Sequence, residues 1–446
     1  MNRETMHIGF DDTDSLRKGC TTYVAALLVE KLLHLKTRFI DYPNLIRLNP
    51  NVPWKTRGNG ALCLRIQYGH KTENEIKEIA ASTIEEHSDL ESEGTDPGLI
   101  FFKGSRIPME FKIFARNAIT GVVTFEDAMK LLEKFKAEAI GFKSGQGIIG
   151  ALAAIGNTLQ GDHTYEILAY RTPEKCGSKR KVDEATIFMM DKVTAPYTFN
   201  SVDTEKGRVI ITPRGPDPIL FGIRGETPQV VKKAFKMVMP LEPVERWVIF
   251  RTNQGTDAHL KKIKKLDQIM PYSSVIARAT VSAKPKVIRG RHVIFSIEDE
   301  SGQVDCAAYE PTGALRSVAR ELAVGDHLEV YGGVRAASSG RPLTINLEKI
   351  RVLKLTPKIV YQNPVCPTCG KRLKSMGKNQ GFRCEKCRQR YAGSGKVEVR
   401  LKRELRRGLY VTSARSQRHL TKPPRRYGME NNGAEPVRLV AEWHFP

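Results

Sequence analysis

The sequence of 446 residues predicts an α+β multidomain protein, on three observations. Strand-like apolar runs alternate with helix-like runs over the first 260 residues, which is typical of mixed α/β units. Five strand-like segments with one intervening helix follow at 274–353. Two Cys-x-x-Cys pairs come after them. At about 100–200 residues per domain, the length allows roughly two to four domains.

The charge of the chain indicates a polyanionic partner. The sequence holds 72 Lys and Arg against 49 Asp and Glu, a net charge of +23, and the surplus is concentrated near the C-terminus. Clustered cations gain affinity for nucleic acid by releasing counterions from its phosphates. A generally basic protein without such a partner is the alternative.

Membrane and secretory classes are not indicated. No run approaches the ~20 apolar residues of a membrane span, and the N-terminus lacks a basic-then-apolar signal pattern. Four of the eight cysteines form metal-type pairs instead of a disulfide framework. We therefore expect a cytoplasmic protein with no membrane partner and no obligate protein partner.

A cluster of aspartates stands near the start of the chain. A short apolar run at 6–10, predicted to be an edge strand, leads into Asp11, Asp12 and Asp14. Carboxylates grouped at a strand end are one way to hold Mg²⁺, which shares its oxygen ligands with substrate phosphates. The acidic loop 91–98 is either an ordinary turn or a second source of carboxylates near this point.

Two further stretches are candidates for phosphate contact. A helix is predicted at about 22–36, and Thr21 at its start is either a plain cap or a hydroxyl beside a phosphate. Polar glycines then run into a small-residue helix at 141–156. There the amides near Gly145 and Gly147 could approach a phosphate, with Lys143 as a point charge. The order of a Walker A loop is absent, and close helix packing by Gly and Ala explains the composition nearly as well.

The remaining elements of the first 260 residues follow from periodicity. In the first part we predict strands at 45–49 and 61–67 and helices at 72–88 and 124–137. In the second we predict strands at 165–170, 208–212, 219–223 and 246–251 and a helix at 227–239. Two polar loops, 215–226 and 252–259, follow strand candidates, so they either line a pocket or form ordinary turns.

The stretch 274–353 carries the clearest architectural signal. Its strands are predicted at 274–283, 291–299, 303–309, 326–334 and 343–353, with a helix at about 311–323. This order matches an OB-fold, a partly open barrel that binds oligonucleotides. Cations on the early strands and the loop favour nucleic acid over a barrel without a ligand: Arg278, Lys284, Lys286, Arg289, Arg291 and His292.

The two cysteine pairs predict a metal site. Cys366 and Cys369 form the first pair, and Cys384 and Cys387 form the second. Four thiolates in this spacing make a closed tetrahedral Zn²⁺ site, and four protein ligands leave no open position for catalysis. After this ribbon, Lys396 to Arg426 contains eleven Lys or Arg and only two acids. That segment is either a disordered tail or an RNA-gripping segment that orders on binding.

Six motifs, taken together and in order, resemble those of the archaeal tRNA-isoleucine 2-agmatinylcytidine synthetases over nearly the whole chain. They are Asp11-Asp12-Thr13-Asp14-Ser15, Gly19-Cys20-Thr21-Thr22-Tyr23, Ile149-Gly150-Ala151-Leu152-Ala153-Ala154-Ile155-Gly156, Gly215-Pro216-Asp217-Pro218, Phe221-Gly222-Ile223-Arg224-Gly225 and Thr252-Asn253-Gln254-Gly255-Thr256-Asp257-Ala258-His259.

The resemblance implies a fold and a reaction. It implies a kinase-like α/β domain at 1–160, a ferredoxin-like domain at 161–262, an OB-fold at 270–355 and a zinc ribbon with a basic tail at 360–430. The reaction would replace the 2-oxo group of the wobble cytidine with agmatine, in an isoleucine tRNA that has the anticodon CAU. ATP would be cleaved to AMP and two phosphates, and the modified tRNA would read AUA codons.

The resemblance also implies roles for particular residues. Asp11, Asp12 and Asp14 would hold Mg²⁺ on the triphosphate, and Thr21 would be the autophosphorylated threonine. We expect ATP contacts at Lys143, Gly145 and Gly147. We expect agmatine contacts at Gly222, Gly225 and Glu226. The alternative function is a non-catalytic RNA or single-strand-binding protein built on the OB-fold and zinc ribbon, which would not need the aspartate cluster.

Overall fold

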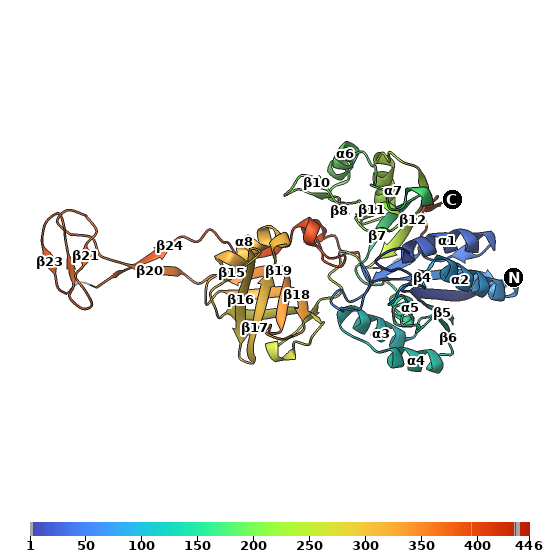
Figure 1. The fold of residues 1–446 in the computed structure, drawn as a ribbon, viewed down its shortest axis with the longest axis horizontal. Helices are drawn as coiled ribbons and strands as arrows, with labels where there is room; N and C mark the ends of the chain where they lie inside the picture. Colours follow the sequence, from blue (N-terminus) through green and yellow to red (C-terminus); the bar gives the residue numbers. More distant parts are fainter. Residues whose placement is uncertain (1–2, 394, 432, 434–437) are drawn as a thin grey trace.

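The structure is a computed structural model, and it describes residues 3–393, 395–431, 433 and 438–446. Figure 1 shows an elongated molecule with a two-lobed body, a barrel beside it, and a small ribbon at the end of a two-stranded arm. Within the described residues, no helix combines the length and the apolar character needed to cross a bilayer.

Strand β1 (Arg3–Asp11) lies inside the sheet of the first lobe. It pairs antiparallel with β4 (Gly60–Gly69) on one side and β5 (Gly98–Lys103) on the other. The prediction of an edge strand was therefore wrong. The run Gly98–Lys103, which we had not assigned, supplies the missing neighbour. Its apolar residues are too few to show a period, so sequence alone did not identify it.

Helices cover both faces of this sheet (Figure 1). The side chains of Met6, Ile8 and Phe10 pack with α1 and α2, while α3 and α5 pack on the opposite face. The remaining elements of the lobe are α1 (Thr21–His34), β2 (Arg38–Phe39), β3 (Asn44–Arg47), α2 (Glu73–His87), α3 (Met109–Thr120), α4 (Phe125–Lys134), β6 (Glu138–Gly141) and α5 (Ile148–Gly156). Helix α3 was not predicted, whereas α1, α2 and α4 lie close to their predicted ranges.

The second lobe continues the same sheet. Strand β3 of the first lobe pairs parallel with β12 (Val244–Thr252), so the strand order is β6-β5-β1-β4-β3-β12-β7-β11-β8. The other elements are β7 (Thr164–Arg171), α6 (Glu184–Thr194), β8 (Thr198–Phe199), β9 (Val202–Asp203), β10 (Arg208–Val209), β11 (Ile219–Gly225) and α7 (Pro228–Met237). Helix α6 was not predicted, and the strand expected at 208–212 is only two residues long.

The barrel confirms the predicted OB-fold. Its strands are β14 (Ser274–Val281), β16 (His292–Asp299), β17 (Gly302–Ala308), β18 (His327–Arg335) and β19 (Thr344–Lys354). Helix α8 (Ala314–Glu321) stands between the third and fourth strands, as expected. Pairing between β14 and β16 closes the barrel, and two short strands, β13 (Lys261–Lys262) and β15 (Lys286–Ile288), flank it.

The zinc ribbon stands away from the body on an antiparallel arm of β20 (Lys358–Gln362) and β24 (Val397–Leu401) (Figure 1). The ribbon itself contains β21 (Lys374–Ser375), β22 (Phe382–Arg383) and β23 (Arg390–Tyr391), paired in that order.

The basic segment after the arm is not a free tail. Its described residues after Leu401, which we call the C-terminal strap, run back across the barrel to the two-lobed body (Figure 1, red). Strand β25 (Gly408–Val411) pairs with β19, and β26 (His444–Phe445) pairs with β12. Trp443 is buried against Tyr42 and Phe39. The prediction of a disordered tail was therefore wrong, because protein carboxylates and strand edges hold this segment without RNA. Contact of its cations with RNA stays a prediction.

Candidate active site

The predicted aspartates follow the end of β1, but among the described residues their carboxylate oxygens do not form a group within 4.8 Å of one another. Asp12 takes a left-handed conformation with φ of 63°, which turns the chain sharply after Asp11. The Oδ2 atom of Asp12 accepts a hydrogen bond from the amide of Asp96 at 3.0 Å. Asp14 lies on the other side of the turn, where Arg57 Nε approaches its Oδ2 atom at 3.4 Å. The loop 91–98 therefore lies against the cluster, as its second interpretation required.

Burial and mutual repulsion disfavour the charged forms of these carboxyls. Burial raises the pKa of Asp12 to about 7, and Asp14 and Asp96 contribute to the increase. The pKa of Asp11 lies well above its usual range because of burial and of repulsion from Asp12 and Asp14. Burial also raises the pKa of Asp14, against the nearby Arg57. A group of crowded, buried oxygen donors with these shifts gains most from a bound cation.

Helix α5 packs directly beneath the aspartates. A Cβ at Gly150 would overlap the carboxylate of Asp11, and a Cβ at Gly147 would lie 2.6 Å from the carbonyl oxygen of Asp11. The amide of Gly147 donates to the Asp96 carbonyl, and that of Gly145 donates to the Phe142 carbonyl, both at 2.9 Å. The glycines thus allow close packing of the backbone. The amides of Gly145 and Gly147 donate to carbonyls of the protein.

Lys143 fixes the acidic loop. Its Nζ atom donates to the carbonyls of Ser92 and Thr95 at 2.8 and 2.9 Å. Its charge also lowers the pKa of Asp12 in part, against the larger effect of burial. In the structure, therefore, Lys143 holds the loop that positions Asp12.

Thr21 is joined to the aspartate turn by a hydroxyl pair. It is the first residue of α1 and is buried. The hydroxyl of Thr13 donates to Thr21 Oγ1 at 3.1 Å. The N-cap residue of α1 is Cys20, and no side chain caps the helix. The plain-cap interpretation of Thr21 is therefore wrong, and its hydroxyl faces the turn that carries Asp12 and Asp14.

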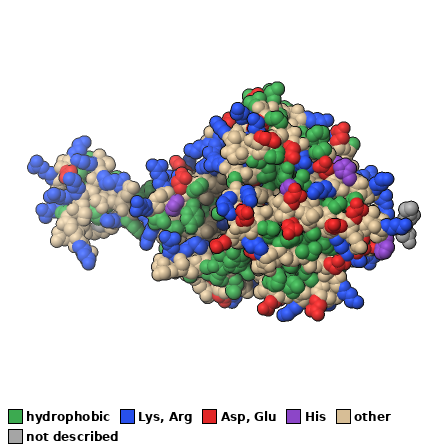
Figure 2. Space-filling model, turned by 45° about the vertical axis from the view of Figure 1, so that its right-hand side comes forward, with side chains coloured by type: hydrophobic (Ala, Val, Ile, Leu, Met, Phe, Trp, Pro, Cys, Tyr) green, Lys and Arg blue, Asp and Glu red, His purple; other side chains and the backbone are tan. Residues whose placement is uncertain are grey.

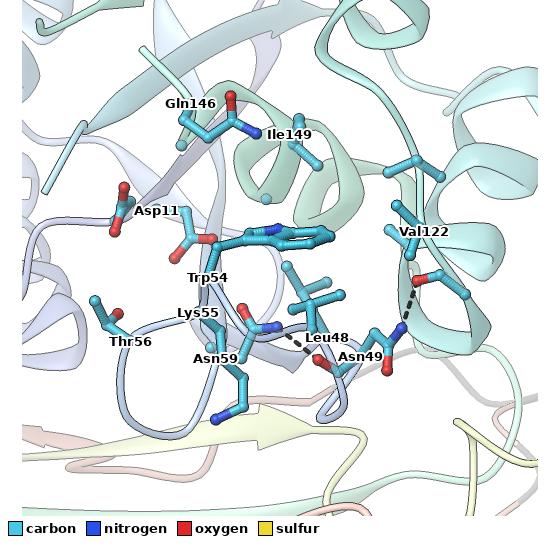
Figure 3. Close-up of a pocket in the computed structure, with 18 residues that line it drawn as sticks. Asp11, Leu48, Asn49, Trp54, Lys55, Thr56, Asn59, Val122, Gln146 and Ile149 are labelled. Atoms are coloured by element: carbon cyan, nitrogen blue, oxygen red, sulfur yellow. Dashed lines mark hydrogen bonds between the residues drawn. The ribbon is translucent and has the colours of Figure 1, made fainter. Parts of the chain in front are cut away.

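A pocket opens beside Asp11 and Asp12 (Figure 3). Trp54, with 59 % of its surface exposed, lies across it, and Leu48 and Ile149 form apolar walls. Polar side chains also line it, among them Asn49, Lys55, Thr56, Asn59 and Gln146. A pocket with one aromatic face, apolar walls and a few amides suits a flat, polar ring such as a nucleotide base.

The predicted agmatine residues lie on the second lobe. The carboxylate of one of them, Glu226, is already bound by a side chain of the protein. Glu226 accepts two hydrogen bonds from the guanidinium of Arg426, at 2.6 and 2.9 Å. Gly225 is packed against Val230 and Val231. Gly222 lies beside the carboxylate of Glu166, because a Cβ there would be 3.2 Å from Glu166 Oε1.

The two predicted polar loops line hollows on the two-lobed body. Gly215 and Pro216 line one groove, and Asn253 and Thr256 line another. The loops also make ordered contacts: the amide of Arg47 donates to Asn253 Oδ1 at 2.8 Å. The pocket-rim interpretation of both loops is therefore confirmed.

Sequence reasoning missed a cluster of charged and polar side chains between the lobes. Arg224 Nε donates to Glu166 Oε1 at 2.9 Å, and its Nη2 donates to His419 Nδ1 at 2.9 Å. Gln254 contacts both Glu166 and His419, at 2.5 and 3.0 Å. Arg47 lies beside them at the end of β3. No sequence signal pointed to Arg47, Glu166 or His419, because each comes from a different region and none belongs to a spaced motif.

The four predicted zinc ligands do converge. The Sγ atoms of Cys366, Cys369, Cys384 and Cys387 all lie within 4.8 Å of one another. Such a set of thiols is suited to a structural Zn²⁺ ion. Figure 2 shows that Lys and Arg dominate the charged side chains on the visible face of the ribbon, the small body at the left.

Four family models match consecutive parts of the chain. They are the TiaS TCKD domain at 7–144, the TiaS FLD domain at 145–259, an OB-fold nucleic acid binding domain at 275–353 and the TiaS C-terminal zinc ribbon domain at 363–405.

Whole-chain relatives agree with these models. The isoleucine-tRNA 2-agmatinylcytidine synthetase TiaS of Methanocaldococcus jannaschii is 42 % identical over 94 % of this chain and 98 % of its own. That of Archaeoglobus fulgidus is 41 % identical over 95 % and 98 %. Among solved structures, a complex of TiaS with its isoleucine tRNA and ATP is 39 % identical, with a TM-score of 0.86 over 98 % of this chain and 100 % of that one. A complex of TiaS with the same tRNA, AMPCPP and agmatine is 37 % identical, covers 98 % and 100 %, and has a TM-score of 0.85.

Proposed function

Because this chain belongs to the TiaS family, we propose that it is an ATP-dependent ligase that joins agmatine to position 2 of a tRNA cytidine. The base is the wobble cytidine of the isoleucine tRNA with the anticodon CAU, and the product reads AUA codons. One observation carries this proposal: relatives named as isoleucine-tRNA 2-agmatinylcytidine synthetases align with at least 94 % of the chain.

The chemistry requires activation of the base. The 2-oxo group of a pyrimidine is a poor leaving group. Transfer of a phosphoryl group from ATP to that oxygen breaks a P–O bond of the nucleotide and turns the oxygen into part of a phosphate leaving group. The primary amine of agmatine then attacks C2, loses a proton, and displaces phosphate with the original 2-oxygen. Water supplies the oxygen of the second phosphate, which leaves AMP as the nucleotide product.

Asp11, Asp12 and Asp14 are the proposed binding groups for Mg²⁺. The donor set fits this ion, since it consists of oxygens whose charged forms are held back by burial and crowding. When bound, Mg²⁺ would neutralise charge on the triphosphate. Lys143 holds the loop that orders Asp12, Gly147 lets α5 approach the turn, and Gly145 packs against Gly141 of β6. We propose that these three residues shape the ATP site through packing, and that the pocket under Trp54 takes the adenine ring.

Thr21 is the proposed phosphate acceptor in the protein. Its hydroxyl lies next to the aspartate turn through the 3.1 Å contact with Thr13. A group in this place is oriented toward the same nucleotide that the aspartates serve.

Agmatine is proposed to approach from the second lobe near Gly222, whose backbone packs closely against Leu168 and the carboxylate of Glu166. Gly225 and Glu226 would support this wall from behind, since Arg426 already satisfies the carboxylate of Glu226. The tRNA cytidine has to leave its stack to reach the site, as base-modifying enzymes generally require.

We further propose four domains with the limits 1–160, 161–262, 270–355 and 360–430, of which the last carries Zn²⁺ on its four cysteines. We place the enzyme in the cytoplasm, where reduced cysteines and tRNA substrates are available.

The test is mass analysis of nucleosides from the CAU tRNA after incubation with the full-length chain, ATP and agmatine. The expected result is a single cytidine that gains one agmatine and loses one water, only when both ATP and agmatine are present. A tRNA with guanosine at the wobble position serves as the control. Binding of the tRNA without any mass gain would instead support the non-catalytic RNA-binding function.

A further inference from the structure

Arg47 occupies a central position in the cluster between the lobes. It ends strand β3, at the junction where β3 pairs with β12 of the second lobe. The charges that act on its guanidinium come from Glu166 and Arg224 on the second lobe and from Asp14 on the first. Its position therefore spans the gap between the aspartates and the second lobe.

The guanidinium of Arg47 lies near Glu166 and Asp14 but is in ion-pair contact with neither carboxylate in the described part of the chain. Its neighbours are paired: Arg224 lies 2.9 Å from Glu166, and Arg57 lies 3.4 Å from Asp14. By contrast, Arg47 forms no ion pair among the described residues, and its buried Nε atom has no hydrogen-bond partner there. A buried cation without a partner is costly, so a site of this kind is completed by an anionic ligand.

His419 adds a second donor beside Arg47. Burial lowers the pKa of His419 well below its usual range, and Arg47 and Arg224 lower it further, so the ring is neutral. His419 Nδ1 lies 2.9 Å from Arg224 Nη2, a donor, and 3.0 Å from Gln254 Oε1, an acceptor; the tautomer that accepts from Arg224 carries its proton on Nε2. That Nε2 atom and Arg47 Nη1 converge on one point, since a Cβ at Gly58 would lie 2.8 and 2.6 Å from them.

We propose that Arg47 and His419 form a phosphate-binding subsite between the aspartate turn and the second lobe, which holds the phosphoryl group during its transfer to the base and its later departure. Guanidinium forks and neutral N–H donors match the tetrahedral oxygens of a phosphate. This inference rests on the proposed function, because that function supplies the phosphate in transit. The strap carries His419, so it also contributes to the active site.

The test compares full-length Arg47→Gln, Arg47→Lys and Gly58→Ala with the wild-type chain. Arg38→Gln is the matched control, because Arg38 is exposed on the same lobe. We expect Arg47→Gln to lower kcat for ligation about 10²-fold, the usual effect of removing one charge-stabilising donor. The KM for agmatine and the Kd for tRNA should change by less than about threefold. Arg47→Lys should recover only part of the rate, since it keeps the charge but not the fork.

Inorganic phosphate is the direct probe. It should stabilise the wild-type chain against thermal unfolding more than chloride of equal ionic strength does, and this difference should disappear in Arg47→Gln and shrink in Gly58→Ala. If Arg47→Gln does not fold, the phosphate stabilisation of Arg47→Lys and Gly58→Ala is compared with that of the wild-type chain instead. Equal phosphate stabilisation in wild type and variants would overturn the proposal. So would a loss of tRNA affinity with phosphate binding intact, which would assign Arg47 to the RNA backbone. The phosphate measurement needs no turnover, so its result is separate from that of the ligation assay.

Discussion

The side chain of Asp12 and the backbone of Asp96 are joined by a hydrogen bond of 3.0 Å, from the Asp96 amide to Asp12 Oδ2. This bond ties the turn after β1 to the loop before β5. It also brings the carboxylate of Asp96 close enough to raise the pKa of Asp12. The acidic turn is thus held in place by the loop before β5, and it is the proposed site for Mg²⁺ and the nucleotide.

Replacing Asp12 by Ala should abolish ATP cleavage to AMP, with a decrease of at least about 10²-fold, because a ligand for the proposed Mg²⁺ is lost. The Kd for tRNA should change little. Thin-layer analysis of labelled ATP and filter binding of tRNA measure the two effects. Glu78→Ala, at an exposed position of α2, is the control. Turnover that survives in Asp12→Ala would contradict the metal assignment.

The buried histidine of β1 should make the chain sensitive to acid. Burial and then Arg65 lower the pKa of His7 to about 3, from an ordinary value of 6.5. Between these values the unfolded chain binds a proton that the folded chain does not. Stability therefore falls as pH drops from 6.5 toward 3, by up to about 1.4 kcal/mol per pH unit.

His7→Gln should weaken this acid dependence, even if it lowers stability at pH 7. Urea unfolding at several pH values between 7 and 4 measures it, with His70→Gln at an exposed position as the control. A slope of unfolding free energy against pH that is the same in His7→Gln and wild type would refute the role of His7.

The ribbon should be removable without harm to the body, whereas the strap should not. Gln362 and Val397 are register partners at the end of the arm, so residues 363–396 can be replaced by a two-residue Asn-Gly turn. We expect the Tm of the body to be unchanged and tRNA affinity to fall with a shallower salt dependence, because phosphate contacts are lost. Truncation after Leu401 keeps the ribbon and removes the strap, and it should lower the Tm. Unaltered tRNA binding after the ribbon excision would exclude the ribbon as a tRNA grip.

Arg426 should be among the most important residues for stability. Its guanidinium is fully buried and pairs with Glu226 and Asp162, at 2.6 and 2.8 Å. Arg426→Met leaves the buried Glu226 carboxylate without its cation, and Asp162 keeps only Lys422 among the described residues, so the change should cost about 3–5 kcal/mol. Urea denaturation measures the loss, and Arg407→Met, at an exposed position of the strap, controls for the change of residue type. A loss below about 1 kcal/mol would show that the pair does not hold the strap.

Gly222→Ala tests the proposed agmatine wall. A Cβ there would lie 2.6 Å from Leu168 and 3.2 Å from Glu166. We expect the KM for agmatine to rise about tenfold or more, with the KM for ATP unchanged, since uniform binding of one substrate is lost. Gly69→Ala, where a Cβ meets nothing within 4 Å, is the control. A rise in both KM values together would argue for a general disturbance of the lobe instead.

Local sequence patterns predicted many of the secondary-structure elements and candidate sites of this protein. The zinc ligands, the five barrel strands and the aspartate turn could each be predicted, because spacing and periodicity within a short stretch are sufficient signals. Short elements such as β5 and α6 were missed, since a few apolar residues show no clear period. The order of the six motifs then identified the family.

Only the tertiary structure decided which charges meet. The sequence of the strap predicts a basic tail. In the structure, Arg426 donates a hydrogen bond to Glu226, and Arg224 contacts His419. Glu226 was a candidate agmatine ligand until the fold supplied its own guanidinium. Conversely, Arg47 carries no motif and acquires significance only because its neighbours are paired and it is not. Charge pairing depends on distances of a few ångströms between segments far apart in the chain, and sequence spacing contains no information about those distances.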